Sequence, residues 1–208
     1  MDRGADHRHG LRSADDDPDD RELEEDAALS FAIAVYREDD QWEADMLPFA
    51  LTSNLDRLIH ALRQQPSISG TIGLVDIGDE FFVALRVLGE RVSVFLSDIT
   101  AAWDWPLAEQ VLEYLDIPVP DEEELEAVLR EGKQMVLPVG DLSIFADLGM
   151  DEMELVALSG DRELLPDEVL SSIAARLGFS QPYERAVDAA LGLGRPGGPP
   201  CPASRRTC

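Results

Sequence analysis

Three apolar runs follow one another between Thr71 and Ile99 with only short turns between them, and they constrain the fold more than any other feature. The turns are Gly78-Asp79 and Gly89-Glu90, and connections this short force antiparallel pairing. The middle run, Phe81–Leu88, is apolar on both faces of a strand. Such a strand is central in its sheet and is covered on both sides. We therefore predict that helices pack on this sheet.

Two further strands precede this stretch, and helices follow it. Phe31–Tyr36 is a short apolar run, and 42–47 returns as its hairpin partner across the turn 38–40. Apolar residues at helical spacing predict helices over 55–62, 106–115, 121–131, 153–158, 166–177 and 180–191. The predicted caps are Ser53, Asp104, Asp151 and Ser180. Strands first and helices later predict an α+β fold: a mostly antiparallel sheet of about five strands in the N-terminal half, followed by a C-terminal helical half packed on it.

The two ends of the chain differ in composition from the middle. Residues 1–28 are polar and acidic without periodicity, and 192–208 are rich in Gly and Pro, so we predict that both are disordered. Residues 29–191 are predicted to form a single α+β domain. No apolar run reaches the ~18 residues that span a bilayer, and the acidic start has no apolar signal core. We expect a cytoplasmic protein with no membrane partner.

The chain is strongly acidic. It has 43 acidic and 17 basic residues, a net charge of −26, and the middle segment holds 32 of the acids with 10 of the bases. Such a surface repels phosphate backbones and attracts basic proteins. We therefore expect a basic protein partner and no direct binding of nucleic acid.

Residue types that perform chemistry at neutral pH are scarce in the middle segment. It has one His, His60, one Lys, Lys133, and no Cys, since Cys201 and Cys208 both lie in the tail. A zinc deaminase carries a His-x-Glu motif and a Pro-Cys-x-x-Cys motif, and neither occurs here. His60 lies opposite the apolar stripe of its helix, which predicts a solvent-facing residue. We expect no catalytic residues, no metal site and no cofactor. A stand-alone small-molecule-binding or enzymatic domain of unknown substrate is the alternative.

The segment Ser97–Pro106 is the most distinctive part of the sequence. It joins the last predicted strand to a helix and holds two of the three Trp residues. One interpretation is that both Trp side chains fasten the helix to the sheet. The other is a partner-binding edge, because strand-to-helix loops carry function and Trp is enriched at interfaces. The predicted partner-binding residues are Asp98, Thr100, Trp103, Asp104 and Trp105.

The chain resembles the family of tRNA adenosine deaminase-associated proteins. The resemblance covers about residues 30–189 and is most specific in the stretch DITAAWDWP; it continues through FAIAVYREDDQWEADML, GLVDIGDEFFVALRV and PDEVLSSIAARLGFSQPYERAVD. It implies a context in tRNA modification and association with a deaminase, and it implies no catalytic residues. Together with the charge, it predicts a non-catalytic acidic partner or regulatory protein that binds a tRNA adenosine deaminase or another basic protein.

Overall fold

The computed structural model describes residues 30–192 except 68, 122, 124–136 and 162. Its strands are β1 (Phe31–Glu38), β2 (Gln41–Met46), β3 (Thr71–Ile77), β4 (Phe81–Leu88), β5 (Arg91–Leu96) and β6 (Val139–Gly140). Its α-helices are α2 (Leu55–Arg63), α3 (Pro106–Leu115), α5 (Glu152–Ser159), α6 (Pro166–Leu177) and α7 (Ser180–Ala190). Short 3-10 helices are η1 (Phe49–Leu51), η2 (Ile99–Trp103) and η3 (Ala146–Leu148). The predicted α+β class is confirmed.

The strands form one antiparallel sheet in the order β2-β1-β3-β4-β5-β6. Within the described part of the chain the sheet has six strands, so the predicted number of about five is one too low. The missed strand, β6, is two residues long and pairs with Phe95 and Leu96 of β5. β6 was not predicted because a segment of two residues is too short to show the alternation of a strand. Pro138 precedes it and Gly140 ends it.

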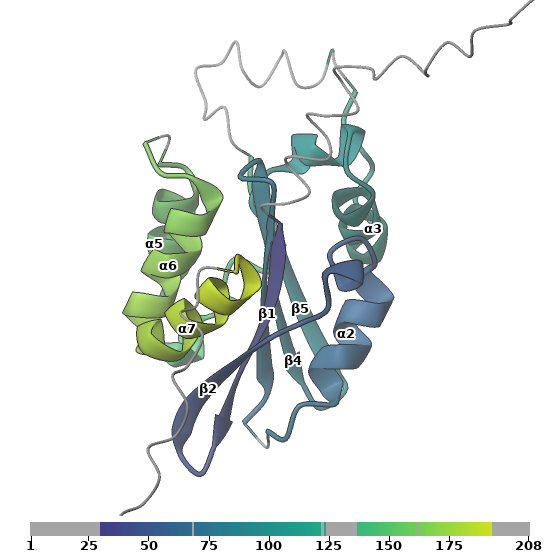
Figure 1. Cartoon of the computed structure of the whole chain (residues 1–208). Coiled ribbons are helices and arrows are strands. Elements are labelled where there is room, and N and C mark those ends of the chain that lie inside the picture. Colours follow the sequence, from purple (N-terminus) through teal and green to yellow (C-terminus); the bar gives the residue numbers. More distant parts are fainter. Residues whose placement is uncertain (1–29, 68, 122, 124–136, 162, 193–208) are drawn as a thin grey trace, which may run out of the picture.

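Helices cover both faces of the sheet, as the apolar character of β4 predicts (Figure 1). On one face, Phe82 and Ala84 belong to a core that includes residues of α5, α6 and α7. On the other face, Phe81 and Val83 belong to a core that includes residues of α2 and α3. The C-terminal helices pack on the sheet as predicted, and the N-terminal helix α2 packs on it as well. Because helices lie on both faces, the molecule has three layers with the sheet in the middle.

The helix caps agree only in part with those predicted. Asp151 caps α5, with its side chain accepting from Glu154 N at 2.9 Å. Asn54, and not Ser53, caps α2 through Arg57 N at 2.9 Å. Asp104 precedes the actual N-cap of α3 by one residue, and Ser180 is already inside α7. The actual N-caps of α3 and α7 are Trp105 and Phe179, which make no side-chain cap, and a shift of one residue at a helix end is the usual error.

Some predictions fall on residues that the structure does not describe. The predicted disordered segments 1–28 and 192–208 lie outside the described residues, apart from Gly192. The predicted helix over 121–131 also lies outside them, apart from Asp121 and Glu123. Within the described ranges, every helix is too short or too polar to cross a lipid bilayer.

Candidate partner-binding site

The segment 97–106 starts from a firm attachment to the sheet. Ser97 is buried directly after β5, and its backbone N donates to the carbonyl of Phe82 at 3.0 Å. Its hydroxyl accepts from the backbone N of Phe82 at 2.9 Å. The pairing of β4 with β5 therefore continues one residue past the strand, and this fixes where the following residues lie.

Asp98 and Thr100 form the cap of η2. The carboxylate of Asp98 accepts from both the backbone N and the hydroxyl of Thr100, each at 2.9 Å. Burial raises the pKa of Asp98, and the hydrogen bonds from Thr100 oppose this increase. Both residues are half-buried. Part of the role of this pair is thus local: it holds the turn from the sheet into η2.

The two Trp side chains of the segment lie in different environments. Trp105 is half-buried, packs against the core that contains α2 and α3, and lies 6.0 Å from the ring of Phe81. Trp103 is 44% exposed, and its indole N donates to the carbonyl of Pro120 at 3.0 Å. The fastening interpretation therefore describes Trp105. Trp103 and its exposed neighbour Asp104 present their side chains to solvent, where a partner can reach them.

An acidic hollow of about 360 Å³ lies beside Asp98. The carboxylates of Asp79, Glu80, Asp98 and Asp161 line it, and Leu164, Leu165 and Val169 supply apolar lining. No Lys or Arg is among the described residues that line it. Its shape and charge suit a Lys or Arg side chain, whose apolar stem and cationic end match these two kinds of lining.

Sequence reasoning missed this hollow. Asp79 and Glu80 belong to the turn between β3 and β4, and Asp161 follows α5, about eighty residues later in the chain. In the sequence, Asp79 signals only a turn and Asp161 only a helix end. Nothing in their spacing indicates that packing of α6 on the sheet brings them together.

A second, mainly apolar hollow of about 190 Å³ lies on the other side of the segment, beside Trp105 and Pro106. Its lining includes Ile77, Leu107 and Phe49, and the side chain of Phe49 is 55% exposed. Apolar hollows lined by aromatic residues are typical of protein interfaces, where a few aromatic residues dominate binding.

Other chemistry has less support in the described residues. His60 lies on the exposed side of α2, as predicted. Among the residues that the structure places, no group of three or more His, Cys, Asp or Glu side chains is arranged to hold a metal ion. Asp76 of β3 is completely buried, and burial raises its pKa to about 8. It lines neither of the two hollows beside the 97–106 segment, so the candidate partner-binding site does not include it.

The chain is similar to known proteins over most of its length. A family model described as "Rv3753c-like tRNA adenosine deaminase-associated protein" matches residues 30–180. Protein Rv3753c of Mycobacterium tuberculosis is 34% identical over 186 residues, which cover 89% of this chain and 97% of that protein. No solved structure matches.

Proposed function

Because this chain belongs to the family of Rv3753c-like tRNA adenosine deaminase-associated proteins, we propose that it is a non-catalytic acidic partner or regulator of a tRNA adenosine deaminase. The observation that carries the proposal is the acidic hollow beside the 97–106 segment. An enzyme that binds tRNA needs a basic surface for the phosphate backbone. A chain of net charge −26 complements such a surface.

The site combines the two contributions that protein interfaces use. The four carboxylates around the hollow attract and orient a basic partner. The exposed rings of Trp103 and Phe49, with the apolar hollow beside Trp105, supply area for tight packing. Thr100 and Trp105 hold the geometry, Asp98 both caps η2 and lines the acidic hollow, and Trp103 and Asp104 make contacts with the partner.

We infer that docking covers part of the RNA-binding surface of the deaminase. A partner whose charge resembles that of tRNA competes with tRNA for the same basic residues. The chain itself is then not a tRNA binder, since its charge opposes this. In this proposal, it regulates access of tRNA or guides assembly of the enzyme.

A binding measurement with matched variants tests the proposal. The deaminase of the same organism is titrated with the chain at about 50 mM salt, where electrostatic contacts are strongest. The test variant combines Asp98→Asn, Asp104→Asn and Asp161→Asn. The control combines Asp56→Asn, Glu184→Gln and Asp188→Asn, three exposed positions on α2 and α7 that give the same change in charge.

We expect a complex at micromolar concentrations that the test variant weakens about tenfold and the control about twofold or less. Trp103→Ala is expected to weaken it as well, and added tRNA is expected to displace the chain. Absence of a complex under these conditions contradicts the proposal. Equal effects of the two triple variants show that the partner binds elsewhere or responds only to net charge.

A further inference from the structure

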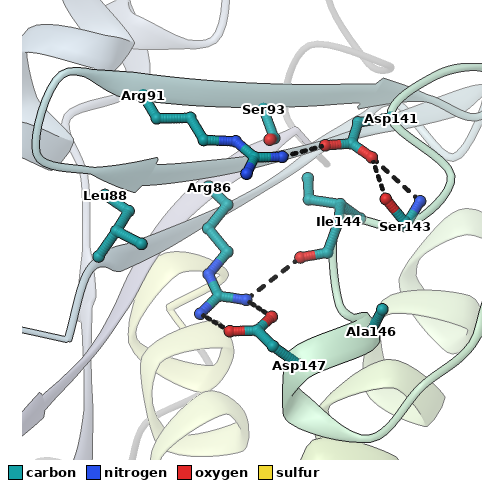
Figure 2. Close-up of a pocket in the computed structure, with 9 residues that line it drawn as sticks. All are labelled: Arg86, Leu88, Arg91, Ser93, Asp141, Ser143, Ile144, Ala146 and Asp147. Carbon is teal, nitrogen blue, oxygen red and sulfur yellow. Dashed lines mark hydrogen bonds and ion pairs between the residues drawn. The ribbon is translucent and has the colours of Figure 1, made fainter.

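A second polar region lies at the opposite end of the sheet, where β4 ends and β5 begins. A hollow of about 320 Å³ there is lined by Arg86, Arg91, Ser93, Asp141, Ser143 and Asp147, among others. Figure 2 shows the two Arg side chains reaching from the sheet, with the carboxylates facing them from the chain that follows β6. This region is unusual in so acidic a protein, because its two Arg residues equal its two Asp residues in number.

An adjoining hollow adds a third Arg. It measures about 340 Å³, shares Arg86 and Asp147 with the first, and is also lined by Arg37, Trp42 and Gly70. The antiparallel register explains why these residues meet: Arg37 is opposite Trp42 on β2, and Arg86 is opposite Ile72 on β3 and Ser93 on β5. Hollows of roughly 300 to 1,000 Å³ hold small molecules in proteins.

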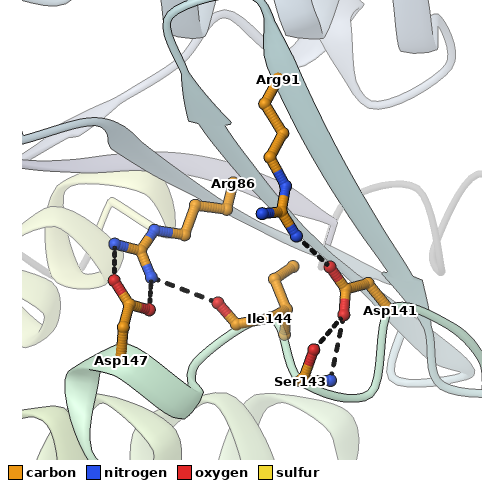
Figure 3. A network of polar contacts seen from close by, with 6 residues as sticks. All are labelled: Arg86, Arg91, Asp141, Ser143, Ile144 and Asp147. Atoms are coloured by element: carbon orange, nitrogen blue, oxygen red, sulfur yellow. Dashed lines mark hydrogen bonds and ion pairs between the residues drawn. The ribbon is translucent and has the colours of Figure 1, made fainter.

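The existing contacts leave donors available on all three guanidinium groups. Arg86 pairs with both carboxylate oxygens of Asp147 and donates to the carbonyl of Ile144 at 3.3 Å (Figure 3). Arg91 has one ion pair, to Asp141 at 3.6 Å, and its side chain is 75% exposed. Arg37 lies 4.5 Å from the ring centre of Trp42, and no ion pair joins it to a carboxylate of the described residues. Three cations thus face two anions.

The carboxylates of Asp141 and Asp147 differ in how firmly their present contacts hold them. Burial works to raise the pKa of Asp141, but hydrogen bonds from Ser93 and Ser143 and the charge of Arg91 lower it overall. Asp147 depends mainly on Arg86, whose hydrogen bonds hold its pKa below the usual range. The side chain of Asp147 is 64% exposed, whereas that of Arg86 is 12% exposed. An incoming anion can therefore take the place of Asp147 while Arg86 stays fixed.

We propose that Arg37, Arg86 and Arg91 bind the phosphoryl group of a small phosphorylated molecule, and that Asp147 occupies the place of this group when no ligand is bound. The planar fork of Arg matches the oxygens of a phosphoryl group. The hydroxyls of Ser93 and Ser143 lie in the same hollow, where they donate to Asp141 and hold it beside Arg91. A long polyanion is disfavoured, because it meets the acidic remainder of the surface, whereas one phosphoryl group meets only its local surroundings.

This site is independent of the partner site. The acidic hollow lies where β4 begins, at Phe82, and the Arg-lined hollows lie where it ends, at Arg86. The two regions also differ in charge, since four acidic residues line the acidic hollow, whereas three Arg and two Asp residues line the Arg-lined hollows. Ligand binding here does not require that the chain binds a deaminase, and failure of either proposal leaves the other standing.

Calorimetric titration of the full chain tests the site with three probes: inorganic phosphate, inorganic pyrophosphate and adenosine 5′-monophosphate. Saturable binding of one equivalent is expected with a dissociation constant of about 1 mM or tighter for at least one probe. Binding of the monophosphate alone indicates a phosphorylated organic ligand, and binding of the inorganic probes alone indicates the free anion. Arg37→Ala and Arg91→Ala are each expected to weaken binding about tenfold.

Two further variants separate a ligand site from a purely structural clamp. Arg57→Ala removes an exposed Arg of α2, which packs on the face of the sheet opposite to the hollows, and it is expected to leave binding unchanged. Asp147→Asn removes the competing charge, so binding is expected to tighten. The proposal is overturned if no probe saturates by about 10 mM, if Arg37→Ala and Arg91→Ala bind like the wild type, or if Asp147→Asn only lowers the melting temperature with no gain in affinity.

Discussion

Trp103 and Trp105 lie two residues apart at the junction of η2 and α3, yet only Trp105 reaches the core, where its ring lies 6.0 Å from that of Phe81. Trp105→Ala is expected to lower the free energy of unfolding by about 2 to 3 kcal/mol, because it leaves a cavity against the sheet. Trp103→Ala removes an exposed ring and one hydrogen bond, and it is expected to cost less than about 1 kcal/mol. Urea unfolding measures both values. Equal costs for the two variants show that Trp103 is also structural.

Asp76 is expected to make stability fall as the pH rises. Burial, followed by the charges of Asp79 and Asp167, raises its pKa to about 8 in the folded protein, against about 3.9 when unfolded. Its two oxygens and the hydroxyl of Tyr183 lack hydrogen-bond partners among the described residues. Burial and then the charge of Asp76 raise the pKa of Tyr183. The backbone N–H groups of Asp79 and Ile77 act in the opposite direction on Asp76 but do not meet hydrogen-bond geometry with it.

The folded protein therefore keeps a proton on Asp76 that the unfolded chain releases above pH 4. The stabilising contribution is complete below pH 4 and is lost between pH 4 and pH 8, by at most about 1.4 kcal/mol per pH unit. Asp76→Asn cannot lose this proton, so its stability relative to the wild type is expected to increase over that range. Chemical unfolding at several pH values measures the difference, with Asp188→Asn as the control. If the difference in stability between Asp76→Asn and the wild type does not change with pH, the pKa of Asp76 is not raised in the folded protein.

Gly140 is expected to be the least replaceable glycine of the sheet. It has a φ of +104°, and a Cβ placed there would lie 2.2 Å from the carbonyl oxygen of Val94. Gly140→Ala is expected to cost about 3 kcal/mol or more and to detach β6 from β5. Exchange of the backbone amide of Asp141, which donates to Val94 at 2.8 Å, reports this detachment.

Gly89 provides the matched control for that variant. Its φ is +61°, and a Cβ there would meet nothing within 4 Å. Gly89→Ala therefore tests the cost of the backbone conformation without a collision. This cost is expected to be about 1 kcal/mol. If both variants cost the same, the close approach to Val94 does not matter.

Asp98 is expected to separate a structural role from a role of charge. Asp98→Ala loses the acceptor for Thr100 N and is expected to lower stability by about 1 kcal/mol. Asp98→Asn keeps an acceptor oxygen in place and is expected to change stability by less than about 0.5 kcal/mol. Thermal unfolding compares the two variants. If this expectation holds, Asp98→Asn is the suitable variant for the binding measurement, since a loss of affinity in that variant does not report unfolding. A large loss of stability in Asp98→Asn indicates that the negative charge itself holds η2.

Local patterns were sufficient for most of the fold. Alternation and short turns predicted the strands from Phe31 to Leu96, and helical spacing predicted α2, α3, α5, α6 and α7. These signals succeed because burial of a strand or helix face requires apolar residues at a fixed period. The two-residue strand β6 has no period to detect, and its place depends on where the loop after residue 136 returns to β5.

The candidate sites, too, were predicted only in part from the sequence. The sequence singled out 97–106, because two Trp residues in one strand-to-helix loop are conspicuous, but it left open which of them is buried. The acidic hollow joins a turn near residue 80 with a helix end near residue 161, and the Arg-lined hollows join β1, β4 and β5 with the chain after β6. Asp76 stands in an otherwise apolar strand, and its pKa follows from burial beneath helices that come a hundred residues later.

The amino-acid order alone thus determined the antiparallel sheet, the need for a helical layer on each face and the negative charge, since these depend on neighbouring residues and on composition. The tertiary structure alone decided which charged side chains share a hollow, which Trp meets solvent and which carboxyl is cut off from water. Those outcomes depend on how distant segments pack, and packing distances are not encoded in the spacing of residues along the chain.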